Sequence, residues 1–423
     1  MSWSPQSLVG LLGVVALCWA VSENRRAFPW RLALAALAIQ VGLVLLLFGL
    51  PQAQAALTGV NAAVDALAGS TQAGSAFIFG FLAGGDQPYP VTSAAGAPFL
   101  FAFRVLPVIL VICALSALLW HWGILKWATR AFGVVFQRTM GLRGPPALAV
   151  AATIFMGQVE GPIFIRSYLD RLTRSELFML MAVGMSCVSG STMVAYATIL
   201  GATLPNAAAH VLTASIISAP AGVLLARVLV PADALEASAP FEAGAEKSYD
   251  SSIDAVIKGT GDGLAVVLNV AATLIVFVAI VALVDRMLGA LPSVAGAPLS
   301  IERGLAIVFH PLAWAIGLPW NEAATGGKLL GVKLVLTEFT AFIQLGAIPS
   351  GELSERSRMI MTYALCGFAN IASVGINVAG FGVLAPNRRT EVQALVWKAL
   401  LVGFLATCMT AAVVGLLPPG LFR

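Results

Sequence analysis

Long apolar runs alternate with short polar segments along the whole chain. Eight of these runs are each close to the roughly 20 residues that a helix needs to cross a bilayer: about residues 8–22, 31–50, 105–123, 176–201, 208–230, 263–290, 357–383 and 391–418. Two further runs, 147–165 and 304–345, are broken internally by polar residues and Pro. The pattern predicts an all-α polytopic membrane protein with eight transmembrane helices and two irregular segments.

Composition agrees with a membrane protein. Of 423 residues, 59% are hydrophobic and only 10% are charged, whereas soluble domains carry about 25% charged residues. The net charge of +4 comes without a basic tract, so we expect no nucleic-acid partner. The five cysteines are scattered singly, which predicts neither a metal site nor a cofactor. No Lys or Arg precedes the first run, so we expect a first span rather than a signal peptide.

Basic residues predict the orientation, because Lys and Arg in short loops mark the cytoplasmic side. Arg25, Arg26 and Arg31 follow the first run, and Arg388 and Arg389 precede the last one. Both termini are therefore expected outside. Residues 51–99 lack Lys and Arg, as an outside segment should, and about 53–68 could lie flat on the membrane surface.

The two broken runs are interpreted as re-entrant hairpins. Run 147–165 has basic residues on both flanks, which fits a segment that enters from the cytoplasm and returns. Its tip is expected at Gly157–Pro162. The segment from about 300 to 350 then starts and ends outside, with its tip at Pro319–Glu322. Irregular backbone at membrane depth is tolerated only inside protein or beside water.

Each hairpin precedes a span that small and polar residues interrupt, at Ser186–Thr192 and at Gly367–Ser373. The order hairpin, broken span and closing span thus occurs twice with opposite orientation. Each expected tip also carries an amide and a carboxylate, which are costly at membrane depth and typical of a substrate or ion pathway. An inverted repeat of this kind predicts a transporter whose site lies between the repeats.

Five motifs resemble the concentrative nucleoside transporter family, in family order: Phe101–Pro107 (FAFRVLP), Gly157–Glu160 (GQVE), Pro319–Ala323 (PWNEA), Leu365–Asn370 (LCGFAN) and Leu384–Arg389 (LAPNRR). The resemblance implies a bacterial inner-membrane homotrimer with an elevator mechanism, not an enzyme. It also implies four parts: scaffold with an interfacial helix (1–146), first transport repeat (147–230), acidic loop with scaffold span six (231–299) and second transport repeat (300–423).

The resemblance also implies a substrate site. Gln158 and Glu160 match residues that hydrogen-bond the nucleobase, and an amide beside a carboxylate supplies both donors and acceptors. Further matched positions are Val159, where relatives carry Thr or Ser, Thr192 near the base, Phe368 packing on the base, and Glu322, Asn370 and Ser373 on the ribose. The structural alternatives are capping of the hairpin tip by Gln158 and Glu160, and ordinary packing of Phe368.

The matched cation site departs from the sodium-coupled pattern. Thr153 stands for an Asn and Cys187 for a hydroxyl residue, leaving the carbonyls of Met156 and Val188. A thiol is a poor ligand for Na⁺, so we predict proton coupling, with Glu160 or Glu322 as carrier. Sodium coupling stays open, as does a free nucleobase or another small polar solute as cargo. An intramembrane serine protease using Ser189 or Ser191 is disfavoured, because no Gly-x-Ser-Gly motif is present.

Overall fold

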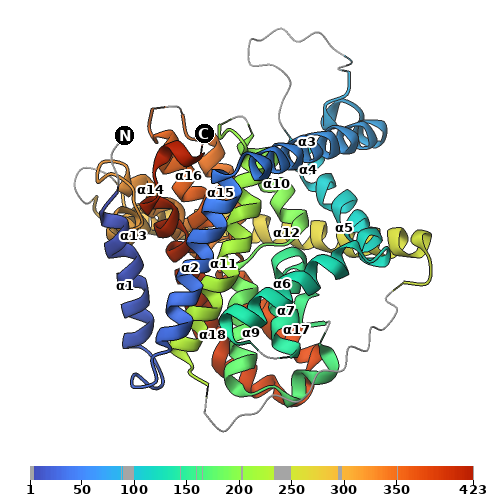
Figure 1. The fold of residues 1–423 in the computed structure, drawn as a ribbon. Coiled ribbons are helices and arrows are strands. Elements are labelled where there is room, and N and C mark those ends of the chain that lie inside the picture. Colours follow the sequence, from blue (N-terminus) through green and yellow to red (C-terminus); the bar gives the residue numbers. More distant parts are fainter. Residues whose placement is uncertain are drawn as a thin grey trace.

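The computed structural model is a bundle of helices (Figure 1). It describes residues 4–86, 88, 100–142, 144–158, 160–163, 165–201, 203–232, 249–293, 298–349 and 351–422. Within these ranges the regular elements are all helical, which agrees with the predicted all-α class. Val159 and Arg143 lie outside the described residues.

The helices fall into a first group up to the middle of the chain and a second group after it. The first comprises α1 (Gln6–Ala20), α2 (Trp30–Gly49), α3 (Pro51–Phe79), η1 (Gly80–Ala83), α4 (Phe101–Arg104), α5 (Leu106–His121), α6 (Ile124–Met140), α7 (Pro145–Met156), α8 (Glu160–Ile163), η2 (Arg166–Arg171), α9 (Arg174–Ser186), α10 (Gly190–Leu200) and α11 (Ala207–Leu229). The second comprises α12 (Ser252–Gly289), α13 (Ile301–Ala315), α14 (Ala323–Val335), α15 (Glu338–Ala347), α16 (Glu355–Leu365), α17 (Ile371–Leu384), η3 (Pro386–Arg388), α18 (Arg389–Leu416) and η4 (Pro419–Phe422).

Seven helical segments in the described part are long and apolar enough to cross a membrane. One of them contains α3, which lies crosswise to α2 near the end of the molecule that holds both chain termini (Figure 1). This placement suits a helix lying along the membrane surface. The first expected span, α1, is shorter, so the number of eight spans stays a prediction.

Both predicted interruptions of a span are confirmed. The first broken span stops at Ser186 and resumes at Gly190, with extended backbone at Cys187. The second stops at Leu365 and resumes at Ile371. The chain therefore repeats one order of elements: α6, the pair α7 and α8, the broken span α9 and α10, and α11 are followed later by α13, the pair α14 and α15, the broken span α16 and α17, and α18.

The predicted tip of the second hairpin needs correction. Pro319–Glu322 forms the turn between α13 and α14. The interruption that corresponds to the first tip lies further on, between Val335 and Glu338, where α14 ends and α15 begins. The physical reason is local, because the Thr337 side chain accepts a hydrogen bond from the backbone N–H of Thr340 and so starts a new helix.

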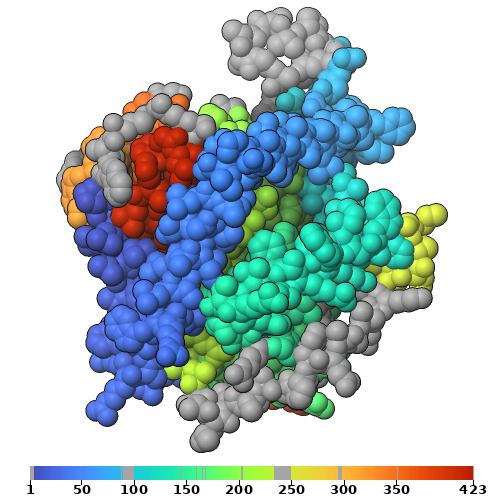
Figure 2. All heavy atoms as spheres, in the orientation of Figure 1, coloured from blue at the N-terminus to red at the C-terminus, as the bar shows by residue number. Residues whose placement is uncertain are grey.

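The closing helices α11 and α18 form the buried centre. In the described residues α1 packs mainly on α18, and α2 packs mainly on α11, so the first two spans contact these helices more extensively than α5 or α12. The long helix α12 packs chiefly on α5 and leaves apolar residues such as Ile275 and Leu283 exposed. In Figure 2 the first half of the chain covers most of the visible face, and α12 emerges at its edge.

Three arginines satisfy backbone carbonyls at helix ends. Arg356 donates to the last carbonyls of α18, Arg358 to carbonyls at the end of α15 and Arg388 to carbonyls of and beside η2. The last turn of a helix leaves carbonyls without an internal partner, so a helix that ends inside the protein needs such donors.

The segments predicted to be cytoplasmic lie together. Glu23, in the α1–α2 loop, forms ion pairs with Arg174 at 3.0 Å and with Lys398 at 2.7 Å. The Glu23 backbone N–H also donates a hydrogen bond to the Leu229 carbonyl at the end of α11. One end of the molecule therefore gathers the loops that the charge pattern assigns to one side of the membrane.

Candidate substrate-binding site

The first hairpin tip brings three side chains around Gly157. Its φ of 100° is a conformation that residues with a side chain rarely adopt. A Cβ added there would lie 3.3 Å from Ser189, 3.7 Å from the Glu160 carboxylate and 3.8 Å from the Phe368 ring. The first hairpin therefore meets both broken spans at its tip. Because Gly157 has no side chain, the space between these three residues is left open at this position.

Gln158 joins the first hairpin to α17. It is 6% exposed, and its Oε1 accepts from Asn377 Nδ2 at 2.7 Å while its Nε2 donates to Ser373 Oγ at 3.4 Å. Glu160, in contrast, is exposed on this chain. Its carboxylate is close enough to Asp262 on α12 for the two negative charges to repel each other. The two residues expected to bind together thus point to neighbouring but different surroundings.

The second tip contributes Glu338. This carboxylate is buried and accepts from Asn370 Nδ2 at 2.5 Å and from the Tyr196 hydroxyl at 2.9 Å. Asn370 also caps α17, because its Oδ1 accepts from the Ser373 backbone N–H at 2.8 Å. A single amide therefore links the second tip to the start of the second half-span.

These contacts form one continuous polar network in the apolar interior. It runs in order through Asn377, Gln158, Ser373, Asn370, Glu338 and Tyr196. The network joins both hairpin tips to both broken spans. Buried polar groups of this kind are retained when they are hydrogen-bonded and serve a function.

The structure does not bring Glu322 to this network. Its carboxylate is half-exposed and accepts from the backbone N–H of Ser354 at 3.2 Å and from its hydroxyl at 3.0 Å. The Thr192 hydroxyl donates to the Ser189 carbonyl at 2.9 Å, at the start of α10, the helix that also carries Tyr196. Of the expected residues, Gln158, Asn370 and Ser373 share the network, and Glu160 and Phe368 lie beside it.

Sequence reasoning missed Glu338, Tyr196 and Asn377 as members of the network. Glu338 carried a signal, since it is an acid inside the apolar run 304–345 and follows Lys333 in the motif Lys333-x-x-x-Thr337-Glu338-Phe339. Tyr196 and Asn377 lie inside apolar helices, and no local pattern distinguishes them.

The expected cation ligands already have partners within the protein. The Thr153 hydroxyl donates to Ala149 at 2.8 Å, and the Cys187 thiol contacts the carbonyl of Ser215 at 3.5 Å. The carbonyl of Val188 lies 3.3 Å from the Ser215 hydroxyl, which also contacts the carbonyl of Ile154 at 3.2 Å. Met156 is half-buried. Among the described residues no cluster of His, Cys, Asp or Glu has the make-up of a metal site.

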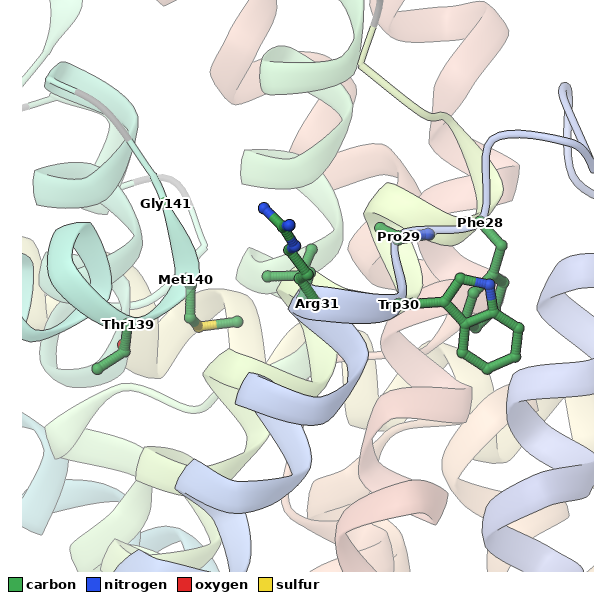
Figure 3. Close-up of a pocket in the computed structure, with 8 residues that line it drawn as sticks. Phe28, Pro29, Trp30, Arg31, Thr139, Met140 and Gly141 are labelled. Carbon is green, nitrogen blue, oxygen red and sulfur yellow. The ribbon is translucent and has the colours of Figure 1, made fainter.

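A separate cavity of about 560 Å³ lies between the start of α2 and the end of α6. Arg31 and Met140 line it from opposite sides (Figure 3). None of the expected site residues lines this cavity, so it is distinct from the polar network.

The class defined by this fold and site is a helical transporter with broken spans around a buried polar network. Models of the family match most of the chain: "Na+ dependent nucleoside transporter N-terminus" (9–82), "Nucleoside recognition" (102–203) and "Na+ dependent nucleoside transporter C-terminus" (210–415).

Similar individual proteins point to the same family as these models. The chain is 34% identical to the nucleoside permease NupC of Helicobacter pylori over 97% of both chains. It is 30% identical to sodium/nucleoside cotransporter 1 of Rattus norvegicus, over 98% of this chain and 64% of that protein. The structure of CNTnw in an inward-facing substrate-bound state is similar, with a TM-score of 0.88 and 33% identity over 97% of both chains. The chain belongs to the concentrative nucleoside transporter family.

Proposed function

We propose that this protein is a secondary active transporter that imports nucleosides by symport with a cation. The observation that carries the proposal is the polar network, because it connects both hairpin tips and both broken spans in an apolar interior. A site built from the interrupted helices of two repeats is the arrangement expected for alternating access. No chemical step on the substrate is involved, so the protein is proposed not to be an enzyme.

The two ends of the network suit the two parts of a nucleoside. Gln158 offers an amide for the nucleobase, with Glu160 and the Phe368 ring beside the same tip. Glu338 and Asn370 offer a carboxylate and an amide for a ribose diol, with Ser373 between the two ends. In this proposal Glu338 takes the ribose role that the sequence suggested for Glu322. Val159 and Thr192 remain proposed contacts of the base.

Protons are proposed as the coupling ion. The Cys187 thiol offers Na⁺ a poor ligand, and the Thr153 hydroxyl and the Val188 carbonyl each contact another group of the protein. A proton needs only a carboxylate, and Glu160 and Glu338 are the carboxylates beside or within the network. Glu322 is no longer preferred as a carrier because it contacts Ser354 away from the network.

Uridine uptake into proteoliposomes tests this proposal. An inward pH gradient without sodium should drive accumulation, and a protonophore should abolish it. Accumulation that requires a Na⁺ gradient and ignores pH would overturn proton coupling while leaving nucleoside transport intact. Absence of uptake with every nucleoside and either gradient would overturn the proposed function itself.

Sodium coupling is the alternative that a specific observation favours. The carbonyls of Ile154 and Val188 each lie within 3.3 Å of the Ser215 hydroxyl, and oxygen is the ligand type that Na⁺ prefers. A free nucleobase as cargo is the other alternative. Competition of uridine uptake by uracil separates it, because a site that needs the ribose end should bind uracil far more weakly.

The arrangement in the membrane is also proposed. The grouping of Glu23, Arg174 and Lys398 at one end supports a cytoplasmic side there, with both termini outside and the hairpins re-entrant. The exposed apolar residues of α12 support a lipid or subunit contact, in keeping with an inner-membrane homotrimer that works by an elevator mechanism.

A further inference from the structure

Lys333 is a buried cation in the second hairpin. Its side chain is 0% exposed, and Nζ donates to the Ala364 carbonyl at 2.8 Å and to Thr407 Oγ1 at 2.7 Å. The Phe404 ring centroid lies 5.6 Å from Nζ. Within the described part of the chain no carboxylate forms a salt bridge with it. Glu338 favours the charged form of Lys333 electrostatically, but burying an ammonium with no carboxylate in contact is costly, so its direct partners need a physical explanation.

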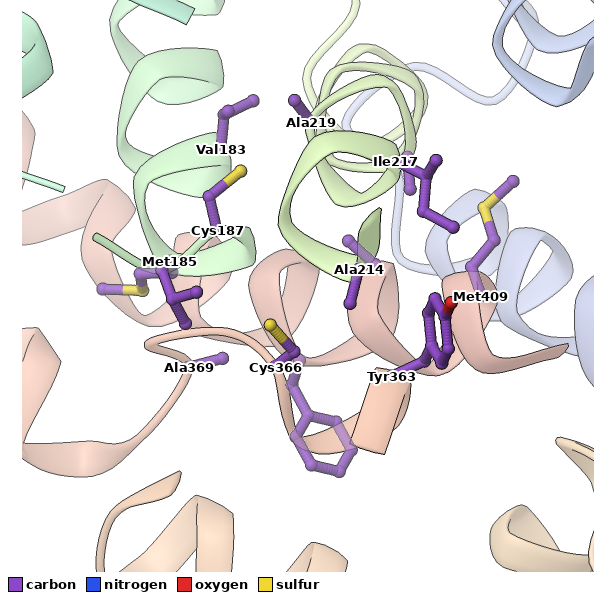
Figure 4. Packing of buried hydrophobic residues seen from close by; sticks show 14 of the residues in the cluster. Val183, Met185, Cys187, Ala214, Ile217, Ala219, Tyr363, Cys366, Ala369 and Met409 are labelled. Carbon is purple, nitrogen blue, oxygen red and sulfur yellow. The ribbon is translucent and has the colours of Figure 1, made fainter. Parts of the chain in front are cut away.

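The Ala364 carbonyl is open because the second span is broken. In a continuous helix the Phe368 N–H would donate to it. That N–H donates instead to the Cys187 carbonyl at 3.3 Å, so the two breaks contact each other. Figure 4 shows Cys187 and Cys366 at these breaks beside α11. The last carbonyls of α16 carry the partial negative charge of a helix end, which a cation stabilises.

The same hairpin places the opposite charge on the other side of the break. Glu338 binds Asn370, the cap of α17, where the start of a helix carries partial positive charge. Lys333 and Glu338 are thus each matched to the helix end that they meet. Together they hydrogen-bond the broken span on both sides of its interruption, Lys333 at the end of α16 and Glu338 at the start of α17.

The first repeat has no Lys at the matching position. Ile154 stands two residues before the end of α7, as Lys333 stands two residues before the end of α14. At the first break the carbonyls of Ile154 and Val188 contact the neutral hydroxyl of Ser215. A buried Lys at this position therefore distinguishes the second repeat from the first.

We propose that Lys333 is a positioning residue for substrate binding: its ammonium holds the end of α16 and so fixes Phe368 and Asn370. The statement about substrate rests on the proposed function. The statement about a cation at the α16 end does not, and it is tested separately below.

The experiment uses the full-length protein with Lys333→Ala, Lys333→Met and Lys333→Arg. Lys328→Met is the control, because Lys328 lies on the same helix in an exposed ion pair with Glu302. Thermal melting and uridine uptake are measured with methylammonium, and tetramethylammonium serves as an ion too large for the vacated space. Lys333→Ala should melt lower, and methylammonium should restore both its melting temperature and its uptake. Lys333→Met fills the space, so it should raise KM for uridine by about tenfold without responding to methylammonium.

Two results would overturn the proposal: a Lys333→Met protein with wild-type KM, or a folded Lys333→Ala protein whose melting and uptake ignore methylammonium. Lys333→Arg keeps the charge and should retain more uptake than Lys333→Met. If Lys333→Ala does not accumulate, Thr407→Val removes one oxygen partner at similar volume and should also raise KM; an unchanged KM contradicts the proposal. If wild-type protein moves no nucleoside, the proposed function fails, and melting with methylammonium still decides the role of the cation.

Discussion

At the scale of single residues, Gln158, Asn370 and Glu338 each hydrogen-bond two partners in the network. Asn370 caps α17 with its oxygen and holds Glu338 with its nitrogen. Gln158 likewise uses both ends of its amide, on Asn377 and Ser373. A residue with two buried partners cannot be replaced without leaving one of them unsatisfied, which costs about 1–3 kcal/mol.

Two glutamates of the second repeat provide a matched comparison. Glu338→Gln removes the charge and one acceptor from the bonds to Tyr196 and Asn370, so uridine uptake should fall by about tenfold or more. Glu322→Gln keeps an acceptor for Ser354 at a half-exposed position and should transport within about twofold of wild type. Uptake by both variants is compared at equal amounts of folded protein. Equal losses would contradict the placement of Glu338 in the site.

At the scale of elements, close approach of helices depends on small residues. On α12, a Cβ added to Gly259 would lie 2.8 Å from both the Ala117 Cβ and the Cys113 carbonyl of α5. A Cβ at Gly261 would meet nothing within 4 Å. Small residues at such contacts let helices in a membrane pack closely.

Replacement of these two glycines should therefore differ. Gly259→Leu should push α12 away from α5 and lower stability by about 1–3 kcal/mol, whereas Gly261→Leu should melt like wild type. Thermal melting of the purified proteins in detergent measures the difference. Equal melting of the two variants would show that α12 does not pack on α5 as described.

The ion pairs of Glu23 give a pH dependence between elements. Partial burial raises the pKa of Glu23, but hydrogen bonds and charge from Lys398 and Arg174 outweigh it and hold the pKa below its ordinary 4.5. A lowered carboxyl pKa means that the stabilisation is complete above the ordinary value and is lost as pH falls through the lowered one.

Glu23→Gln should thus reduce stability by about 0.2–1 kcal/mol at neutral pH. The difference from wild type should stay constant toward higher pH, shrink as pH falls below the ordinary pKa of 4.5, and vanish in acid below the lowered pKa of the folded protein. Melting temperatures across pH provide the measurement. A difference that grows in acid would contradict the stated direction.

At the scale of the whole molecule, the loops that the charge pattern assigns to one side of the membrane also lie together in the fold. The loops rich in Lys and Arg meet at one end of the bundle, and α3 lies near the other end with both chain termini (Figure 1). The charge rule predicts that this first end faces the cytoplasm and that the first hairpin enters from there.

Labelling of single cysteines in a cysteine-free background tests the orientation. The exposed residues Gln137 and Asp170 flank the first hairpin, and Thr58 is exposed on α3. An impermeant maleimide on intact cells should label Thr58→Cys. It should label Gln137→Cys and Asp170→Cys only after permeabilisation. Reaction of exactly one hairpin flank in intact cells would make α7 and α8 part of an ordinary span.

The sequence by itself determined the membrane class, the family, the two broken spans and the first hairpin tip. These features are local, because hydropathy, basic flanks and interruptions such as Cys187–Ser189 act within one helix length. Gln158, Asn370 and Ser373 were found because they interrupt apolar runs and match family motifs.

Only the tertiary structure decided which carboxylate joins the network. Glu322 and Glu338 both stand inside apolar surroundings in the sequence, and the difference between them is which helix each faces across the repeat. The hydrogen bonds of Tyr196, of Asn377 and of Lys333 to the end of α16 likewise join segments far apart in the chain. Hydrogen bonds of this range depend on how the two repeats pack, which no local pattern specifies.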